Sequence, residues 1–274
     1  MREDGSQFPQ RVAVYIDGFN LYYGMKESGL KPYFWLDVVK MSNGLLRHGQ
    51  VLASVNYFSA NLAGGRKSDP PHDRAYKEGK LSRQRAYLNA LLSKGGLNIK
   101  LGRYQSIPKN CRHCGRTYSR YEEKHTDVNI ATSMMKGAYL REYDCAFLIS
   151  GDSDLTSAVR AIRELWPQVR VIAQFPPNRQ CSDLKEACTG FSHIQAGLIR
   201  RSQLPDVVAG KKGRRYERPH EWTAESAEKE KAKKDAARAA ALKAVALKQP
   251  AEPILPSQAE SMLHGCPCCP QAEQ

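Results

Sequence analysis

Short apolar runs alternate with longer amphipathic stretches along most of this chain. The apolar runs predict β-strands, which we place at 11–17, 51–58, 97–101, 145–150 and 169–175. The stretches between them have helical periodicity, and they predict helices at 18–30, 34–47, 73–94, 127–142 and 154–165. Strands that alternate with helices form right-handed β-α-β units with helices on both faces of the sheet. We therefore expect an α/β three-layer sandwich with a mainly parallel, five-stranded sheet.

The composition changes after about residue 203, beyond the last predicted strand and a normal domain length. Residues 221–248 are rich in Ala, Lys and Glu and predict a helix with little apolar surface. Residues 249–274 contain five prolines and predict disorder. We expect one domain over 10–203, followed by a basic tail over 204–274 that is largely disordered.

Composition also narrows the class of protein. The chain has no stretch of about 18 apolar residues, and its first ten residues are too polar for a secretory signal. We therefore expect a cytoplasmic protein without a membrane partner. The formal net charge is +14, and basic proteins attract polyanions, among which nucleic acid is the commonest. RNA is the partner we expect, although the charge is also compatible with simple solvation of the surface.

Four aspartates fall where a parallel sheet binds its ligands. Asp17 ends the first predicted strand, Asp152 and Asp154 follow the fourth strand, and Asp127 heads the fourth helix. Ligands bind beyond the carboxyl ends of parallel strands, so these side chains converge if the first and fourth strands are neighbours. Carboxylates that lie close together raise one another's pKa, and a divalent cation such as Mg²⁺ relieves that conflict. Each aspartate, taken singly, is also an ordinary helix cap.

Three separated runs match a known family in that family's order. They are VAVYIDGFNLYYG at 12–24, EEKHTDVNIATSMM at 122–135 and FLISGDSDLTSAVRAIRE at 147–164. With these motifs the chain resembles the NYN domains of the PIN-like nuclease superfamily, in their LabA-like branch. The resemblance covers roughly residues 10–200, a normal domain length, and three motifs make it more specific than one.

The resemblance implies a PIN-like fold and a Mg²⁺- or Mn²⁺-dependent ribonuclease, acting on single-stranded or structured RNA. It gives metal-binding and catalytic roles to Asp17, Asp127, Asp152 and Asp154. It also includes Asn20 in the catalytic site, as a polar neighbour of the substrate or the metal. Ser150 matches the small hydroxyl residue before the Gly-Asp pair, where it would contact substrate. All of the family's acids are present, so the resemblance implies an active enzyme that hydrolyses phosphodiester bonds without a covalent intermediate.

Basic and aromatic residues near the same edge are candidates for binding RNA. Arg66 and Lys67 lie in the loop after the second strand, where they are candidate contacts for the RNA backbone. The next helix adds Arg74, Lys77, Arg83 and Arg85. The aromatic candidates for stacking on bases are Tyr22, Tyr23 and Tyr104. The first two are as compatible with packing the first helix on the sheet, and the helix charges with solvation.

A C-x-x-C pair, Cys111 and Cys114, supplies half of a zinc site. Structural zinc needs four ligands, and no second C-x-x-C follows at a usual spacing. The residues available to complete the set are His113, His125, Cys181 and Cys188. The cysteines of the tail, Cys266, Cys268 and Cys269, bind metal separately or are free thiols. The sequence therefore leaves a zinc site open.

Two other classes of function stay open beside the nuclease. A non-catalytic RNA-binding regulatory module needs the basic surface but not all four acids. The family also includes a bacterial protein assigned as an NADH-dependent monooxygenase of 6-hydroxy-3-succinoylpyridine in nicotine degradation. Under that alternative NADH would be a cofactor, but the chain has no G-x-G-x-x-G turn after a strand. The spacing of its histidines does not indicate an iron site of two His and one carboxylate either.

Overall fold

The computed structural model describes residues 9–110 except 66 and 68, residues 117–229, and residues 232, 233, 235, 236 and 239. Within strands 98–110 and 117–124, it describes the backbone but not the side chains of 103–109 and 117–124. Of the described chain, 9–104 and 123–227 form one compact unit, and 105–122 belong to a second. The core and the candidate site described below lie in the first unit.

A seven-stranded sheet runs through the fold, in the order β4-β3-β2-β1-β5-β6-β7. Its strands are β1 Gln10–Asp17, β2 Gln50–Ala60, β3 Asn98–Asn110, β4 Thr117–Lys124, β5 Cys145–Ile149, β6 Arg170–Phe175 and β7 Gly190–His193. Neighbouring strands pair in parallel across six of the seven, namely β3, β2, β1, β5, β6 and β7. The predicted α/β sandwich with a mainly parallel sheet is therefore confirmed, and β1 and β5 are neighbours.

The predicted number of five strands was too low because β4 and β7 carry no apolar run. The sequence of β4 is TYSRYEEK, which is mostly polar. The sequence of β7 is GFSH, four residues that are alternately half-buried and exposed. A strand of a parallel sheet is readable as a continuous apolar run only where both of its faces are buried, and these two lie at the edges of the sheet.

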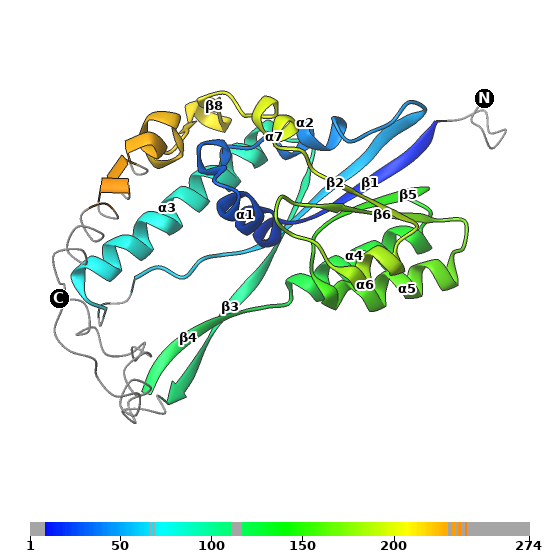
Figure 1. The fold of residues 1–274 in the computed structure, drawn as a ribbon, viewed down its shortest axis with the longest axis horizontal. Helices are drawn as coiled ribbons and strands as arrows, with labels where there is room; N and C mark the ends of the chain where they lie inside the picture. The colour runs from blue at the N-terminus through cyan, green and yellow to red at the C-terminus, as the bar shows by residue number, and fades with distance from the viewer. Residues whose placement is uncertain are drawn as a thin grey trace, which may run out of the picture. The chain divides into compact units, whose positions relative to one another are not determined.

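Helices cover both faces of the sheet (Figure 1). One face carries α1 Gly18–Glu27, α2 Val38–Asn43, α3 Pro71–Lys94 and α7 Ala196–Arg201, and the other carries α4 Thr126–Tyr139, α5 Thr156–Leu165 and α6 Ser182–Ala187. Along β1, Val12, Val14 and Ile16 pack on the first face, whereas Ala13 and Tyr15 pack on the second. None of the helices in the described part of the chain is long and apolar enough to cross a membrane.

Some helices differ from their predicted bounds. The stretch predicted as one helix over 34–47 contains only α2, preceded by a 3-10 turn at Lys31–Tyr33. The helix predicted at 154–165 begins as a second 3-10 turn, Ser153–Leu155. The helices α6 and α7 were not predicted, because six residues are too few to show a helical period.

Residues 204–222, which the sequence assigns to the tail, contribute to the core of the main unit. The short strands β8 Val207–Ala209 and β9 Arg215–Glu217 pair antiparallel and pack on α3. Trp222 is 8% exposed. Its ring lies against three aromatic rings of the core, those of Phe34, Trp35 and Tyr87. The packed part of the chain therefore extends past residue 203.

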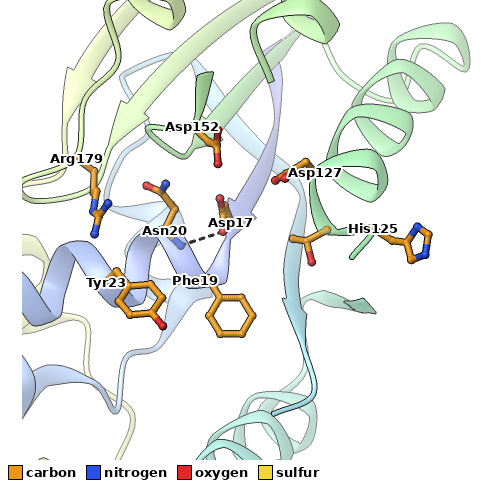
Figure 2. A pocket seen from close by; sticks show the side chains of 9 residues that line it. Asp17, Phe19, Asn20, Tyr23, His125, Asp127, Asp152 and Arg179 are labelled. Atoms are coloured by element: carbon orange, nitrogen blue, oxygen red, sulfur yellow. Dashed lines mark hydrogen bonds between the residues drawn. The ribbon is translucent and has the colours of Figure 1, made fainter. Parts of the chain in front are cut away.

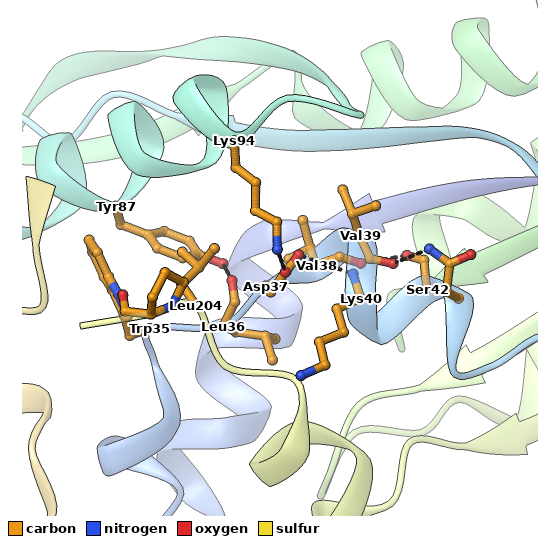
Figure 3. A network of polar contacts seen from close by, with 12 residues as sticks. Trp35, Leu36, Asp37, Val38, Val39, Lys40, Ser42, Tyr87, Lys94 and Leu204 are labelled. Atoms are coloured by element: carbon orange, nitrogen blue, oxygen red, sulfur yellow. Dashed lines mark hydrogen bonds and ion pairs between the residues drawn. The ribbon is translucent and has the colours of Figure 1, made fainter. Parts of the chain in front are cut away.

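A buried carboxylate, Asp37, joins α2, α3 and the chain just before this segment (Figure 3). Asp37 accepts a hydrogen bond from the backbone N–H of Lys40, which caps α2, and it forms an ion pair with Lys94 of α3. Its own backbone N–H donates to the carbonyl of Ser202 at 2.8 Å. A buried charge is tolerated where such partners satisfy it, so we assign Asp37 a structural role.

We expect Trp222→Ala to lower the free energy of unfolding by about 3–5 kcal/mol, as is usual when a large buried aromatic ring is removed. Urea denaturation of the purified protein would measure the change. Tyr139→Ala is the control, because that ring is 72% exposed and its loss should have little effect. Equal stability of Trp222→Ala and the unsubstituted protein would show that residues 204–222 are not part of the folded core.

Candidate metal centre

Asp17 stands where β1 passes directly into α1. One carboxylate oxygen accepts a hydrogen bond from the backbone N–H of Asn20 at 3.0 Å, which caps α1. The other accepts from the hydroxyl of Ser150 at 3.0 Å. Gly18 permits the sharp passage, because a Cβ there would lie 2.6 Å from the carbonyl oxygen of Phe58. Asp17 is only 5% exposed, so its direction is fixed by both strand and helix.

The chain leaving β5 lies beside Asp17 because Ile149 pairs with Ile16 in the sheet. The hydroxyl oxygen of Ser150, which donates to Asp17, also accepts from the backbone N–H of Asp152 at 3.1 Å. The backbone N–H of Gly151 donates to the side-chain oxygen of Asn20 at 2.9 Å. One hydrogen-bond network therefore sets the positions of Asp17, Asn20 and Asp152 relative to one another.

Asp127 comes to the same place from the first turn of α4. His125, just before the helix, has a left-handed backbone with φ of 80°. Burial raises the pKa of Asp127, and the negative charges of Asp152 and Asp154 raise it further. A cation bound among these groups would favour their ionised forms and reverse this shift.

Carboxylate oxygens of Asp17, Asp127 and Asp152 all lie within 4.8 Å of one another (Figure 2). The three come from different elements: the end of β1, the start of α4 and the loop after β5. Oxygen ligands around Mg²⁺ lie about 2.0–2.1 Å from the ion, so small side-chain movements would bring all three into contact with one ion. A set made only of carboxylate oxygens suits hard divalent cations such as Mg²⁺ or Mn²⁺.

The fourth predicted ligand, Asp154, lies outside this group of three. Its side chain is exposed, and its backbone N–H donates to the carboxylate of Asp152 at 3.0 Å. It therefore adds negative potential near Asp127 and supports the conformation of Asp152. A metal-binding role for Asp154 stays a prediction.

The three acids line one part of a pocket with a volume of about 220 Å³. The other residues around it are Phe19, Asn20, Tyr23, His125, Thr126 and Arg179. Arg179 and Tyr23 lie across the pocket from Asp127, and the ring of His125 points away from the acids (Figure 2). The pocket therefore combines an acidic part with an aromatic and cationic part.

Sequence reasoning missed Phe19 and Arg179. Arg179 follows β6, which lies next to β5 in the sheet. Since ligands bind beyond the carboxyl ends of parallel strands, the position of Arg179 four residues after β6 was an available signal. Phe19 lies within the first matched motif, between Asp17 and Asn20, and gave no signal of its own.

The other candidates are only partly brought to the pocket. Ser150 is fully buried and does not line the pocket, so the contacts described above support an orienting role, and its substrate contact stays a prediction. Tyr22 packs against Phe34, with ring centroids 4.7 Å apart, whereas Tyr23 is 42% exposed. Stacking on bases is therefore available to Tyr23 but not to the inward-packed Tyr22.

Apart from His125, which lines the pocket with its ring turned away from the acids, the predicted basic contacts and the zinc candidates lie away from the pocket or outside the described residues. Lys67 is exposed and does not line the pocket. Lys77 and Arg83 form ion pairs with acidic residues, Asp69 and Glu221. Outside the described residues lie Arg66, Cys111, His113, Cys114 and the side chain of Tyr104. Cys188 is buried in the core, and burial raises the pKa of its thiol to about 11.

The fold and this acidic site define an α/β domain with a candidate divalent-metal centre. The centre lies at the carboxyl ends of β1 and β5, where the order of the strands in the sheet reverses. Residues 11–195 match the model of the NYN domain, and the chain belongs to this family.

Known proteins that are similar to this chain include an enzyme and a protein of solved structure. The 6-hydroxy-3-succinoylpyridine 3-monooxygenase HspA of Pseudomonas putida is 27% identical over 241 residues, covering 74% of this chain and 73% of that protein. The crystal structure of a protein of unknown function from Vibrio parahaemolyticus is also similar, with 18% sequence identity and a TM-score of 0.39. The match covers 70% of this chain and 96% of the Vibrio chain.

Asp127→Asn tests the crowding of negative charge at the site. The raised pKa means that the folded chain disfavours the ionised form of Asp127, so removing this charge should stabilise the metal-free protein. The gain should be below about 1 kcal/mol, because solvent screens a half-exposed group. Thermal unfolding in EDTA would measure it, and the same variant should gain less stability from added Mg²⁺ than the unsubstituted protein does.

Glu164→Gln is the matched control, since it removes a negative charge from the exposed surface of α5. A lower stability of Asp127→Asn in EDTA would contradict the interpretation. It would show that Asp127 mainly stabilises the start of α4 through the helix dipole.

Proposed function

We propose that this chain is a divalent-metal-dependent ribonuclease that hydrolyses phosphodiester bonds in RNA. The observation that carries the proposal is the group of three carboxylates, from three separate elements, inside a pocket of an NYN domain. A group of like charges is costly to hold together unless a cation neutralises it. The fold nevertheless holds two of these carboxylates with specific hydrogen bonds, which supports a selected function for the group.

In this proposal Asp17, Asp127 and Asp152 hold the ion. A bound Mg²⁺ or Mn²⁺ would neutralise charge on the phosphate and lower the pKa of a water molecule. The protein contributes the arrangement of its carboxylates: Ser150 fixes both Asp17 and the backbone of Asp152. Asn20 ties α1 to the loop after β5 through Gly151, so the acids from both strands keep one geometry.

The charge of the chain supports a polyanionic substrate. The acids alone would repel a phosphate backbone, but the chain as a whole carries +14. Such an excess attracts nucleic acid over a distance and accounts for a salt-dependent part of the affinity. Arg179 places one of these positive charges at the pocket itself.

The similarity to HspA supports a second candidate function, the monooxygenation of 6-hydroxy-3-succinoylpyridine. The identity of 27% makes this a distant comparison. Non-haem Fe(II) oxygenases use two histidines and one carboxylate. Among the described residues, the group that qualifies as a metal site consists of three aspartates instead. This donor set suits phosphodiester hydrolysis better than oxygen chemistry, and we prefer the nuclease.

We expect Asp17→Asn and Asp152→Asn to lower the rate of RNA cleavage more than about a hundredfold, because each removes a ligand. Ser150→Ala should lower it about 10–100-fold, the usual effect of losing a group that orients a ligand. Asp154→Asn should have a smaller effect than Asp152→Asn, because Asp154 lies outside the group of three. The measurement is cleavage of labelled single-stranded RNA with Mg²⁺, with Mn²⁺ and with EDTA, and Glu164→Gln is the control.

The outcomes separate the candidate functions. Cleavage that needs the metal and is lost in Asp152→Asn supports the proposal. Tight binding of RNA without cleavage by the unsubstituted protein would favour a regulatory binding module. NADH consumption that depends on 6-hydroxy-3-succinoylpyridine, with RNA left intact, would overturn the proposal in favour of the monooxygenase.

A further inference from the structure

The part of the pocket opposite Asp127 contains two aromatic rings from α1. Phe19 and Tyr23 are one helical turn apart, with ring centroids separated by 6.4 Å and planes 27° from parallel. Tyr22 supports Tyr23 edge-on, with ring centroids 5.3 Å apart. Tyr23 is nevertheless 42% exposed, and the Nζ of Lys26 lies 5.9 Å from the centre of its ring. Two aromatic rings are therefore held in place at the pocket (Figure 2).

Arg179 beside these rings is placed by a tightly packed loop. A Cβ at Gly24 of α1 would lie 2.5 Å from the carbonyl oxygen of Pro177, and one at Gly151 would lie 3.2 Å from the backbone of Arg179. The backbone N–H of Arg179 donates to the carbonyl of Pro176 at 3.1 Å, which closes a tight turn. The loop after β6 therefore packs directly on α1 and on the loop that carries Asp152.

The guanidinium of Arg179 is only partly used by the protein itself. One terminal nitrogen forms an ion pair with Glu27 of α1. The Nε–H is enclosed by protein and has no acceptor among the described residues. The side chain is 33% exposed, so part of it faces solvent at the pocket. A guanidinium offers five hydrogen-bond donors in a planar fork that matches phosphate oxygens. Arg179 uses only some of these donors within the protein, so others are available to a phosphate.

We propose that Phe19, Tyr23 and Arg179 form a subsite for one unpaired nucleotide of single-stranded RNA, next to the bond that is cut. The base stacks on the aromatic pair, and Arg179 binds the neighbouring phosphate. This inference rests on the proposed function, because it places the cut phosphate at the acids. The bases of a duplex are stacked on one another and are not free to stack on aromatic side chains, so the subsite selects single strands over duplexes.

Binding would be measured in an Asp152→Asn background, in which the RNA stays intact, with a short fluorescent single strand and its duplex as the probes. Tyr23→Leu keeps an apolar side chain but removes the ring, and it should weaken single-strand binding about tenfold. Tyr23→Phe keeps the ring and should keep the affinity. Neither change should alter duplex binding.

Arg179→Gln removes the cation and should weaken single-strand binding about tenfold, with a salt dependence that is lower by about one unit of slope. In the protein with Asp152 intact, Tyr23→Leu and Arg179→Gln should mainly raise KM and leave kcat nearly unchanged, as expected for a contact that binds the substrate and the transition state equally. The matched controls are Tyr139→Leu, at the far end of α4, and Arg170→Gln, at the exposed start of β6.

Single-strand affinity that is equal in Tyr23→Leu and Tyr23→Phe overturns the subsite, and so does an Arg179→Gln variant with unchanged affinity and salt slope. A duplex that is bound as tightly as the single strand overturns it too. Failure of the proposed function gives a different result: the protein with Asp152 intact then cuts no RNA with any metal. The binding series still decides the subsite in that case, because it uses a variant that does not need to cut.

Discussion

The hydrogen bond from Ser150 to Asp17 joins the ends of the two central strands, and the arrangement of the site depends on it. It exists because β1 and β5 are parallel neighbours, so their carboxyl ends lie side by side. Ser150 is fully buried, and its hydroxyl also accepts from the backbone of Asp152. One small side chain thus sets the spacing of two carboxylates that repel each other.

The rest of the fold makes this costly arrangement sustainable. Each central strand is buried between two layers of helices, with alternate side chains in the two core clusters. On one face, the aromatic cluster around Trp222 and the buried Asp37 tie α2, α3 and the segment after 202 together. The free energy gained from this hydrophobic burial offsets the repulsion among the carboxylates of the site. The like charges are confined to a pocket where a cation or substrate can meet them.

Much of the fold was predictable because its central strands are buried on both faces and read as unbroken apolar runs. Asp17 and Asp152 were predictable for the same reason, since each directly follows such a run. The edge strand β7, the six-residue helices and the packing of Trp222 were not, because they lack a periodic pattern or depend on contacts distant in sequence. Two aspartates separated by one residue look equivalent in sequence, yet only Asp152 joins the group of three and Asp154 remains exposed.

The position of Arg179 after β6 places it near the carboxyl edge of the sheet, but the sequence does not predict that its side chain lines the pocket. Its loop has no pattern of its own, and its position depends on the absence of side chains at Gly24 and Gly151. Only the structure shows that these glycines let the loop reach the pocket.

Asp17, Asp127 and Asp152 are expected to bind one divalent cation together. Anomalous diffraction from crystals soaked in Mn²⁺ would detect that ion. A peak is expected within bonding distance of an oxygen from each of the three carboxylates. Ordered carboxylates with no peak between them, in crystals that hold Mn²⁺ elsewhere, would contradict this expectation.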